Sequence, residues 1–231
     1  MPSVIVLKKG REEALGRFHP WIFSGALAAV KGNPREGDVV EVRSAAGCFL
    51  ALGHYQTGSI AVRVLAFEPC RIDTAFWHDA LLKAFRVRQA LQLPGNPHTS
   101  AYRLVHGEGD FLPGLIIDIY GSAAVIQAHS AGMFLARNDI AAALQEIYGG
   151  ALRHIYDKSA ATVPFKSGLD AHDEYLLKSA ATAGEETVSE NGYRFAVNWE
   201  TGQKTGFFLD QRDNRQLLMR YAKGRHVLNL F

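Results

Sequence analysis

The segment 202–215 holds the residue types best suited to recognising a nucleotide-like ligand. Two glycines permit tight turns, and Phe207 and Phe208 offer flat apolar rings. Asp210 is expected to cap the helix that follows by accepting a hydrogen bond from a backbone N–H. A helix N-terminus beside a ligand suits polar recognition, and helix capping with core packing is the alternative role of this segment.

Residues 17–23 combine basic and aromatic side chains. We predict that Arg17 and His19 contact RNA, because Arg binds phosphate and aromatic rings stack on bases. Simple solvation is the alternative for both. Trp21 and Phe23 alternate onto one face of a strand, so we expect them to fill the core of a small barrel.

For the other residues with reactive side chains, we expect structural roles and not catalytic ones. Glu108 and Asp110 on a glycine-rich turn could act as acid and base or bind a hard cation, but turn chemistry with an ion pair to Arg103 is favoured. Cys48 and Cys70 have no basic cluster nearby, so we expect unreactive thiols. The nine histidines show no ligand spacing, and we predict no metal site.

The elements that must position these residues begin with a β-rich stretch. Short apolar runs between turn residues predict strands at 39–42, 49–55 and 60–67. Several short strands at such spacing are typical of a small barrel.

An α+β arrangement follows. Asp73 or Thr74 is expected to cap a long helix that ends near Leu91. Residues 158–184 are weakly patterned and are interpreted as a loop. The order β-β-β-α-β is predicted for the stretch between, with strands at 102–105, 115–120 and 124–129, a helix at 133–148 and a strand at 153–157.

The last part of the chain predicts a hairpin, a helix and a strand. Asn191-Gly192 favours a type I′ turn before a strand at 193–198. The final apolar run, 226–231, is typical of a strand buried on both faces, which needs neighbours that no following residues supply, so we expect an incomplete sheet. The helix at 210–222 is expected to bury three side chains: Leu217, Leu218 and Tyr221.

Composition excludes several classes of protein. Hydrophobic residues make up 48% of the 231 residues and charged residues 21%, so a disordered chain is excluded. The net charge is +2, but residues 1–72 hold nine basic and six acidic residues, which permits contact with nucleic acid. We see neither a signal peptide nor an apolar run long enough for a membrane span, and we expect a soluble cytoplasmic protein.

Three segments carry a resemblance to a known family. They are HPWIFSG at 19–25, YRLVHGEGD with LPGLIID at 102–118, and GQKTGFFLDQRDNR at 202–215, the last followed by VLNLF. Together they resemble the class I S-adenosylmethionine-dependent RNA methyltransferases that make 5-methylcytosine in large-subunit ribosomal RNA. Residues 158–166 depart from that family, which usually shows a basic run there.

The resemblance implies an α+β fold in three parts. Residues 1–72 would form a PUA-like RNA-binding barrel, and residues 73–184 an α+β middle domain. Residues 185–231 would supply the hairpin, helix and first strand of a Rossmann-like methyltransferase domain. The family's catalytic cysteine has no counterpart in this chain, so the resemblance implies no catalytic residue here and no activity for the chain alone.

The resemblance also implies ligands. S-adenosylmethionine would be the cofactor and ribosomal RNA the partner, with no membrane association and with a homodimer left open. A non-catalytic RNA-binding adaptor is the alternative function, and a scaffold without a nucleic-acid role is a third. Four residues would lie at the cofactor: Lys204, Phe208, Asp210 and Arg212.

Overall fold

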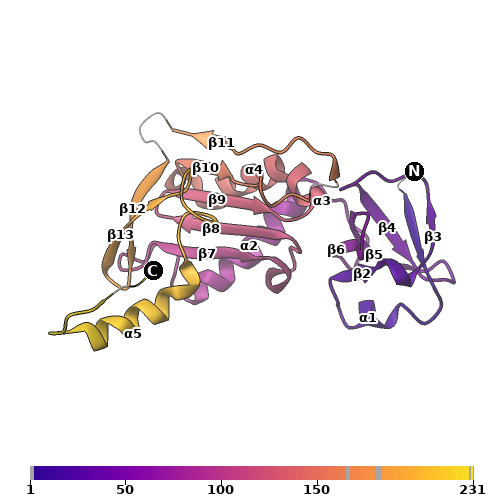
Figure 1. Cartoon of the computed structure of the whole chain (residues 1–231). Coiled ribbons are helices and arrows are strands. Elements are labelled where there is room, and N and C mark those ends of the chain that lie inside the picture. The colour runs from indigo at the N-terminus through magenta and orange to yellow at the C-terminus, as the bar shows by residue number, and fades with distance from the viewer. Residues whose placement is uncertain (1–2, 165–166, 180–183, 229, 231) are drawn as a thin grey trace.

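The computed structural model describes residues 3–164, 167–179, 184–228 and 230. These residues form a six-stranded, a five-stranded and a two-stranded sheet, which follow one another along the chain (Figure 1). No helix in this described part of the chain has the length and apolar character needed to cross a lipid bilayer.

The six-stranded sheet forms the N-terminal barrel, in the order β2-β6-β5-β4-β1-β3. The predicted strands are confirmed as β4, β5 and β6, and three short strands near the N-terminus were not predicted. A small apolar core that includes Ile5, Val42 and Val62 holds the sheet together. A short helix, α1 (Glu13–Gly16), lies between the first two strands. The strands are β1 (Val4–Leu7), β2 (Trp21–Phe23), β3 (Leu27–Lys31), β4 (Val39–Arg43), β5 (Phe49–Tyr55) and β6 (Ile60–Ala66).

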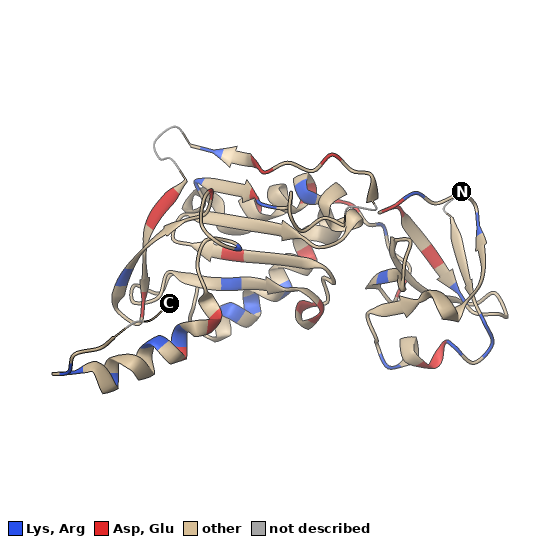
Figure 2. Ribbon diagram, in the orientation of Figure 1, with Lys and Arg blue, Asp and Glu red and all other residues tan. Residues whose placement is uncertain are grey.

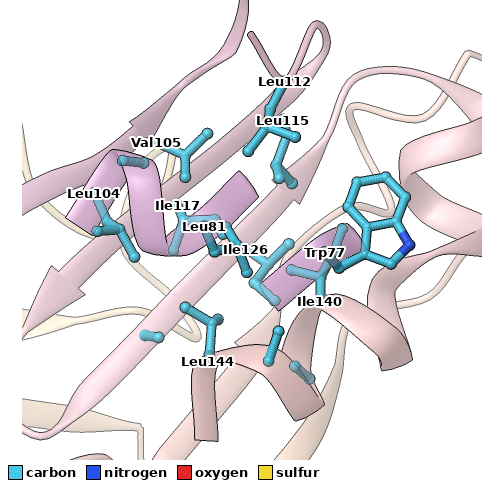
Figure 3. Close-up of a cluster of buried hydrophobic side chains, with 14 of the residues drawn as sticks. Trp77, Leu81, Leu104, Val105, Leu112, Leu115, Ile117, Ile126, Ile140 and Leu144 are labelled. Atoms are coloured by element: carbon cyan, nitrogen blue, oxygen red, sulfur yellow. The ribbon is translucent and has the colours of Figure 1, made fainter. Parts of the chain in front are cut away.

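The five-stranded middle sheet has the order β11-β10-β9-β8-β7. Its core lies between one sheet face and the helices, where Trp77, Leu81 and Ile140 pack against Ile117 and Ile126 (Figure 3). The strands are β7 (Ala101–His106), β8 (Leu115–Tyr120), β9 (Ala123–Ala128), β10 (His154–Asp157) and β11 (Glu174–Lys178). The helices are α2 (Thr74–Ala90), α3 (Ala131–Leu135) and α4 (Arg137–Tyr148).

The predicted elements of this middle part are largely confirmed. The carboxylate of Asp73 accepts a hydrogen bond from the Phe76 N–H, 3.2 Å away, as expected of the helix cap. The helix predicted at 133–148 is two helices that meet at Ala136. The loop interpretation of 158–184 is wrong for β11, which forms because it pairs with β10 across the sheet edge.

The hairpin of β12 (Glu185–Glu190) and β13 (Tyr193–Asn198) covers part of the second face of the middle sheet. Asn191 and Gly192 have φ values of 51° and 83°, the positive values that a type I′ turn requires, so this prediction is confirmed. The Trp199 side chain is fully buried in the cluster between the hairpin and the sheet.

The C-terminal segment differs from the prediction. The helix α5 (Arg212–Ala222) has no buried residue, and the three side chains expected on its inner face are exposed, because α5 extends away from the sheets (Figure 1). The strand expected at 226–231 is absent from its described residues: Leu228 is 80% exposed and Leu230 77%. Among the described residues, no strand pairs with this segment. Residues 229 and 231 lie outside the described residues.

The barrel and the middle sheet meet where α3 contacts β5. His54 of β5 is buried there, with its ring stacked 6.1 Å from that of Trp77 between centroids. A Cβ added to Gly132 of α3 would lie 2.1 Å from Cγ of His54, so only glycine fits at this contact.

Candidate functional site

The turn at 202–206 is anchored to the second face of the middle sheet by Thr205. Its hydroxyl is buried, donates to Oδ2 of Asp118 at 2.6 Å, and lies 2.8 Å from the hydroxyl of Tyr120. Asp118 is fully buried and also accepts two hydrogen bonds from Arg103, at 2.8 and 3.0 Å. This network fixes the turn that presents Lys204.

Arg215 fixes the start of α5 against the hairpin. It donates to both carboxylate oxygens of Glu190 at 2.7 Å each and to the Phe208 carbonyl at 2.9 Å. Its guanidinium carbon lies 4.2 Å from the centre of the Phe207 ring, a cation–π contact. Arg215 was not among the predicted site residues, although its three-residue spacing from Arg212 places both on one side of the helix.

The four predicted cofactor residues divide into two groups. Lys204, Phe208 and Asp210 are exposed, and the Lys204 ammonium lies 5.1 Å from the centre of the Phe208 ring. Arg212 is half-buried and donates to the Ala101 carbonyl at 2.6 Å, so its described contacts hold α5 to the sheet.

Asp210 does not cap α5, contrary to the expectation. It lies inside a short 3-10 turn, Leu209–Gln211, and Gln211 occupies the position before the helix. The Asp210 carboxylate accepts from the Gln211 side chain at 3.3 Å instead.

A cavity of about 640 Å³ opens on the half of the sheet face that the hairpin leaves uncovered. We call it the sheet-face cavity. Gln127 of β9 and Ile116 of β8 line its floor. Arg63 of the barrel, Lys158 after β10 and Lys204 of the anchored turn line its sides, so distant parts of the sequence build one site.

Lys158 joins the cavity to the hairpin. Its ammonium donates to the carbonyls of Trp199 and Gly202, at 2.6 and 2.5 Å. Burial lowers the pKa of Lys158, while the nearby Asp173 opposes that shift. Lys158 was not among the predicted site residues; it lies in the segment that departs from the family's basic run.

The predicted RNA contacts of the barrel, Arg17 and His19, are exposed. The core assignment of Trp21 and Phe23 is wrong: Ile22 is the buried residue of β2, and Phe23 is 49% exposed. Since alternate residues face opposite sides of a strand, burial of Ile22 turns both neighbours outward. The rings of His19, Trp21 and Phe23 lie 6.0–6.3 Å apart between centroids and form an aromatic surface.

The two carboxylates of the glycine-rich turn have structural partners, but not Arg103. Glu108 accepts from the indole N–H of Trp21 at 2.9 Å, which links the middle sheet to the barrel. Asp110 pairs with Arg88 of α2 through both oxygens, one of them at 2.8 Å. Arg103 forms its ion pair with Asp118 instead, which lies opposite it on β8.

Neither cysteine has the surroundings of a nucleophile. Cys48 and Cys70 are exposed free thiols. Partial burial and the nearby carboxylates of Asp73 and Glu68 raise the pKa of the Cys70 thiol, which disfavours the reactive thiolate. Among the described residues, no group of three or more His, Cys, Asp or Glu side chains could hold a metal ion.

Comparison with known proteins identifies the barrel. Residues 5–67 match a family described as "PUA-like domain". Over the whole chain, two proteins named "Ribosomal RNA large subunit methyltransferase I" are similar. The one from Erwinia tasmaniensis is 39% identical over 229 residues, covering 98% of this chain and 57% of that protein. The one from Tolumonas auensis is 41% identical over 234 residues, covering 100% of this chain and 58% of that protein.

Solved structures support the same fold. A protein described as a SAM-dependent methyltransferase from Streptococcus mutans aligns with 96% of this chain and 55% of its own, with a TM-score of 0.76 and 21% identity. A methyltransferase structure complexed with SAH aligns equally well, with a TM-score of 0.76 and 22% identity over 95% of this chain and 54% of that one. The α+β class and the PUA-like barrel expected from the sequence are therefore confirmed.

The chain spans a little more than half the length of the curated relatives it matches. The predicted family resemblance is confirmed along all of it. The chain is therefore similar, over its whole length, to proteins named "Ribosomal RNA large subunit methyltransferase I", and its barrel matches the PUA-like domain family.

Proposed function

We propose that this chain is the RNA-recognition portion, and one wall of the cofactor site, of an enzyme that transfers methyl from S-adenosylmethionine to C5 of a cytosine in large-subunit ribosomal RNA. The observation that carries the proposal is similarity over the whole chain, at about 40% identity, to proteins named as ribosomal RNA large subunit methyltransferases. We propose the divisions at 1–72, 73–184 and 185–231 as its three functional parts.

The barrel supplies the first RNA contacts in this proposal. Arg17 and His19 are exposed beside the rings of Trp21 and Phe23, and such a combination binds phosphate and stacks on unpaired bases. Basic residues also occur on α2 (Figure 2), so RNA that leaves the barrel meets further positive charge on the same molecule.

The cofactor contacts fit only as one side of a pocket. Phe208 offers a flat exposed ring and Asp210 an exposed carboxylate, groups that suit an adenine face and ribose hydroxyls. Lys204 lies over the same ring but also lines the sheet-face cavity, to which we assign it, and Arg212 positions the helix, so Phe208 and Asp210 are the proposed cofactor contacts. S-adenosylmethionine, when bound, supplies the methyl group from its sulfonium.

We expect the chain by itself to bind RNA without methylating it. In the proposed reaction a cysteine attacks C6 of the cytosine, and the raised pKa of Cys70 and the position of Cys48 in a barrel turn favour neither thiol for that role. Transfer of tritiated methyl from S-adenosylmethionine to ribosomal RNA by this chain would contradict that expectation.

The adaptor alternative has less support. It requires the apolar segment after α5 to pair at an edge of the middle sheet, but Val227 and Leu228 are 56% and 80% exposed. Among the described residues, the edges of that sheet are β7 and β11, and neither pairs with this segment.

Filter binding tests the RNA proposal directly. A structured fragment of large-subunit ribosomal RNA should bind the wild-type chain with an affinity that falls steeply as salt increases. Arg17→Ala should weaken binding and reduce the salt dependence, whereas Arg220→Ala, on the exposed part of α5, serves as the charge-matched control. Binding that does not respond to salt, or equal effects of both substitutions, would count against the proposal.

A further inference from the structure

The floor of the sheet-face cavity carries the side-chain amide of Gln127. Gln127 is only 9% exposed, and its side chain has no hydrogen-bond partner among the residues that the structure describes. Buried polar side chains are almost always hydrogen-bonded. The amide offers one acceptor and two donors, which is the combination that reads the edge of a nucleobase.

The sides of the cavity carry positive charge with free donors. Arg63 uses one guanidinium nitrogen to bind the Gln56 side chain at 2.8 Å, which leaves other donors available. Lys158 donates to two carbonyls and keeps a third N–H, and Lys204 is exposed. These three cations come from the barrel, the loop after β10 and the anchored turn.

The carboxylates in the cavity are already engaged. Glu108 accepts from the Trp21 indole, and Asp173 accepts from the Ala160 N–H at 2.9 Å. Arg103, a fourth cation at the cavity, is paired with Asp118 beneath it. An anion that enters the cavity therefore meets more positive than negative charge.

We propose that the sheet-face cavity binds one unstacked nucleotide of single-stranded RNA, with its phosphate at Arg63, Lys158 and Lys204 and its base edge at Gln127. The cavity volume lies within the usual range for small-ligand sites. Only an unpaired nucleotide can present its base edge to such a hollow. The inference rests on the proposed RNA-binding function and adds a site separate from the barrel surface.

Fluorescence anisotropy with a labelled single-stranded RNA of about 12 nucleotides tests the site. Lys204→Ala should weaken binding about fivefold to tenfold and lower the salt slope by about 1, because a phosphate contact is lost. Gln127→Met keeps the side-chain volume; it should weaken binding about threefold and leave the salt slope unchanged. Arg220→Ala should bind as wild type.

Two comparisons separate failure of the cavity from failure of RNA binding. If Lys204→Ala and Gln127→Met bind as wild type while Arg17→Ala binds weakly, the cavity proposal is overturned and the barrel function stands. If the wild type binds neither this RNA nor structured ribosomal RNA, both proposals fail. A duplex of the same sequence should bind at least about tenfold more weakly, and equal binding would also overturn the cavity site. Thermal unfolding verifies that each variant is folded.

Discussion

Arg215 of α5 and Glu190 at the end of β12 form a two-pronged ion pair, with both N···O distances at 2.7 Å. The Glu190 side chain is only 2% exposed, so its charge depends on this partner and on Arg212, 3.6 Å away. The pair connects α5 to the hairpin that covers part of the middle sheet.

Arg215→Lys should therefore destabilise the chain although the charge is kept. Lysine cannot reproduce two parallel hydrogen bonds, so we expect a loss of about 1–3 kcal/mol in the free energy of unfolding, measured with urea. Arg220→Lys, an exposed position on the same helix, is the control and should change stability by less than about 0.5 kcal/mol. Equal stability of the two variants would show that the ion pair contributes nothing.

The Thr205 hydroxyl should matter more than its methyl group. Thr205→Val leaves the buried Asp118 carboxylate without one donor and should cost about 1–3 kcal/mol, whereas Thr205→Ser keeps that bond and should cost less. Urea unfolding of both variants measures the difference. The prediction fails if serine is as destabilising as valine.

His54 should make the chain sensitive to mild acid. Burial, and secondarily the charge of Arg63, lowers the pKa of His54 from 6.5 to about 4. The unfolded chain then takes up a proton more readily than the folded chain, so stability is complete above pH 6.5 and is lost as the pH falls toward 4. Between about pH 7.5 and pH 5 we expect a loss of about 2 kcal/mol from this residue.

The control isolates that contribution. His54→Gln cannot be protonated, so its free energy of unfolding should fall less over the same pH range than that of the wild type. His98→Gln, at an exposed histidine, should retain the full wild-type pH dependence. Parallel pH profiles for wild type and His54→Gln would refute the assignment.

The hydrogen bond from Trp21 to Glu108 should couple the barrel to the middle sheet. We expect a coupling energy of about 0.5–1.5 kcal/mol in a double-mutant cycle of Trp21→Phe and Glu108→Gln. Urea unfolding of the four proteins measures it. Strict additivity of the single substitutions would mean that the contact contributes no stability.

The sequence predicted correctly those structural features that depend on residues close together in the chain. The Asp73 cap, the Asn191-Gly192 turn and the apolar strands of the middle sheet depend on residues close together in the chain. Alternation in β2 correctly separates Ile22 from its neighbours, but it does not say which face is inside. Ile22 is buried because it joins the barrel core with Val42 and Val62, whereas Trp21 bonds to Glu108, 87 positions along the chain.

The candidate site was only partly predictable for the same reason. Lys204 and Phe208 were assigned to a ligand because the segment 202–215 resembles a family motif. Nothing in the sequence around Gln127 or Arg63 indicates a binding site. Their possible role follows only from the fold, in which the sheet and the barrel place both residues at one cavity. Arg212 was assigned to the cofactor, whereas its contacts with Ala101 and Glu190 hold α5 in place.

The missing side chain of Gly132 has a mechanical consequence. The His54 ring occupies the space that a Cβ of residue 132 would need, so the barrel packs directly against the backbone of α3. Sliding of the barrel along α3 would produce steric clashes at this close-packed contact. The spacing between the aromatic surface of the barrel and Lys204 is thus set by the fold. In the proposed RNA-binding function, an RNA that contacts both sites must span a distance that the fold keeps constant.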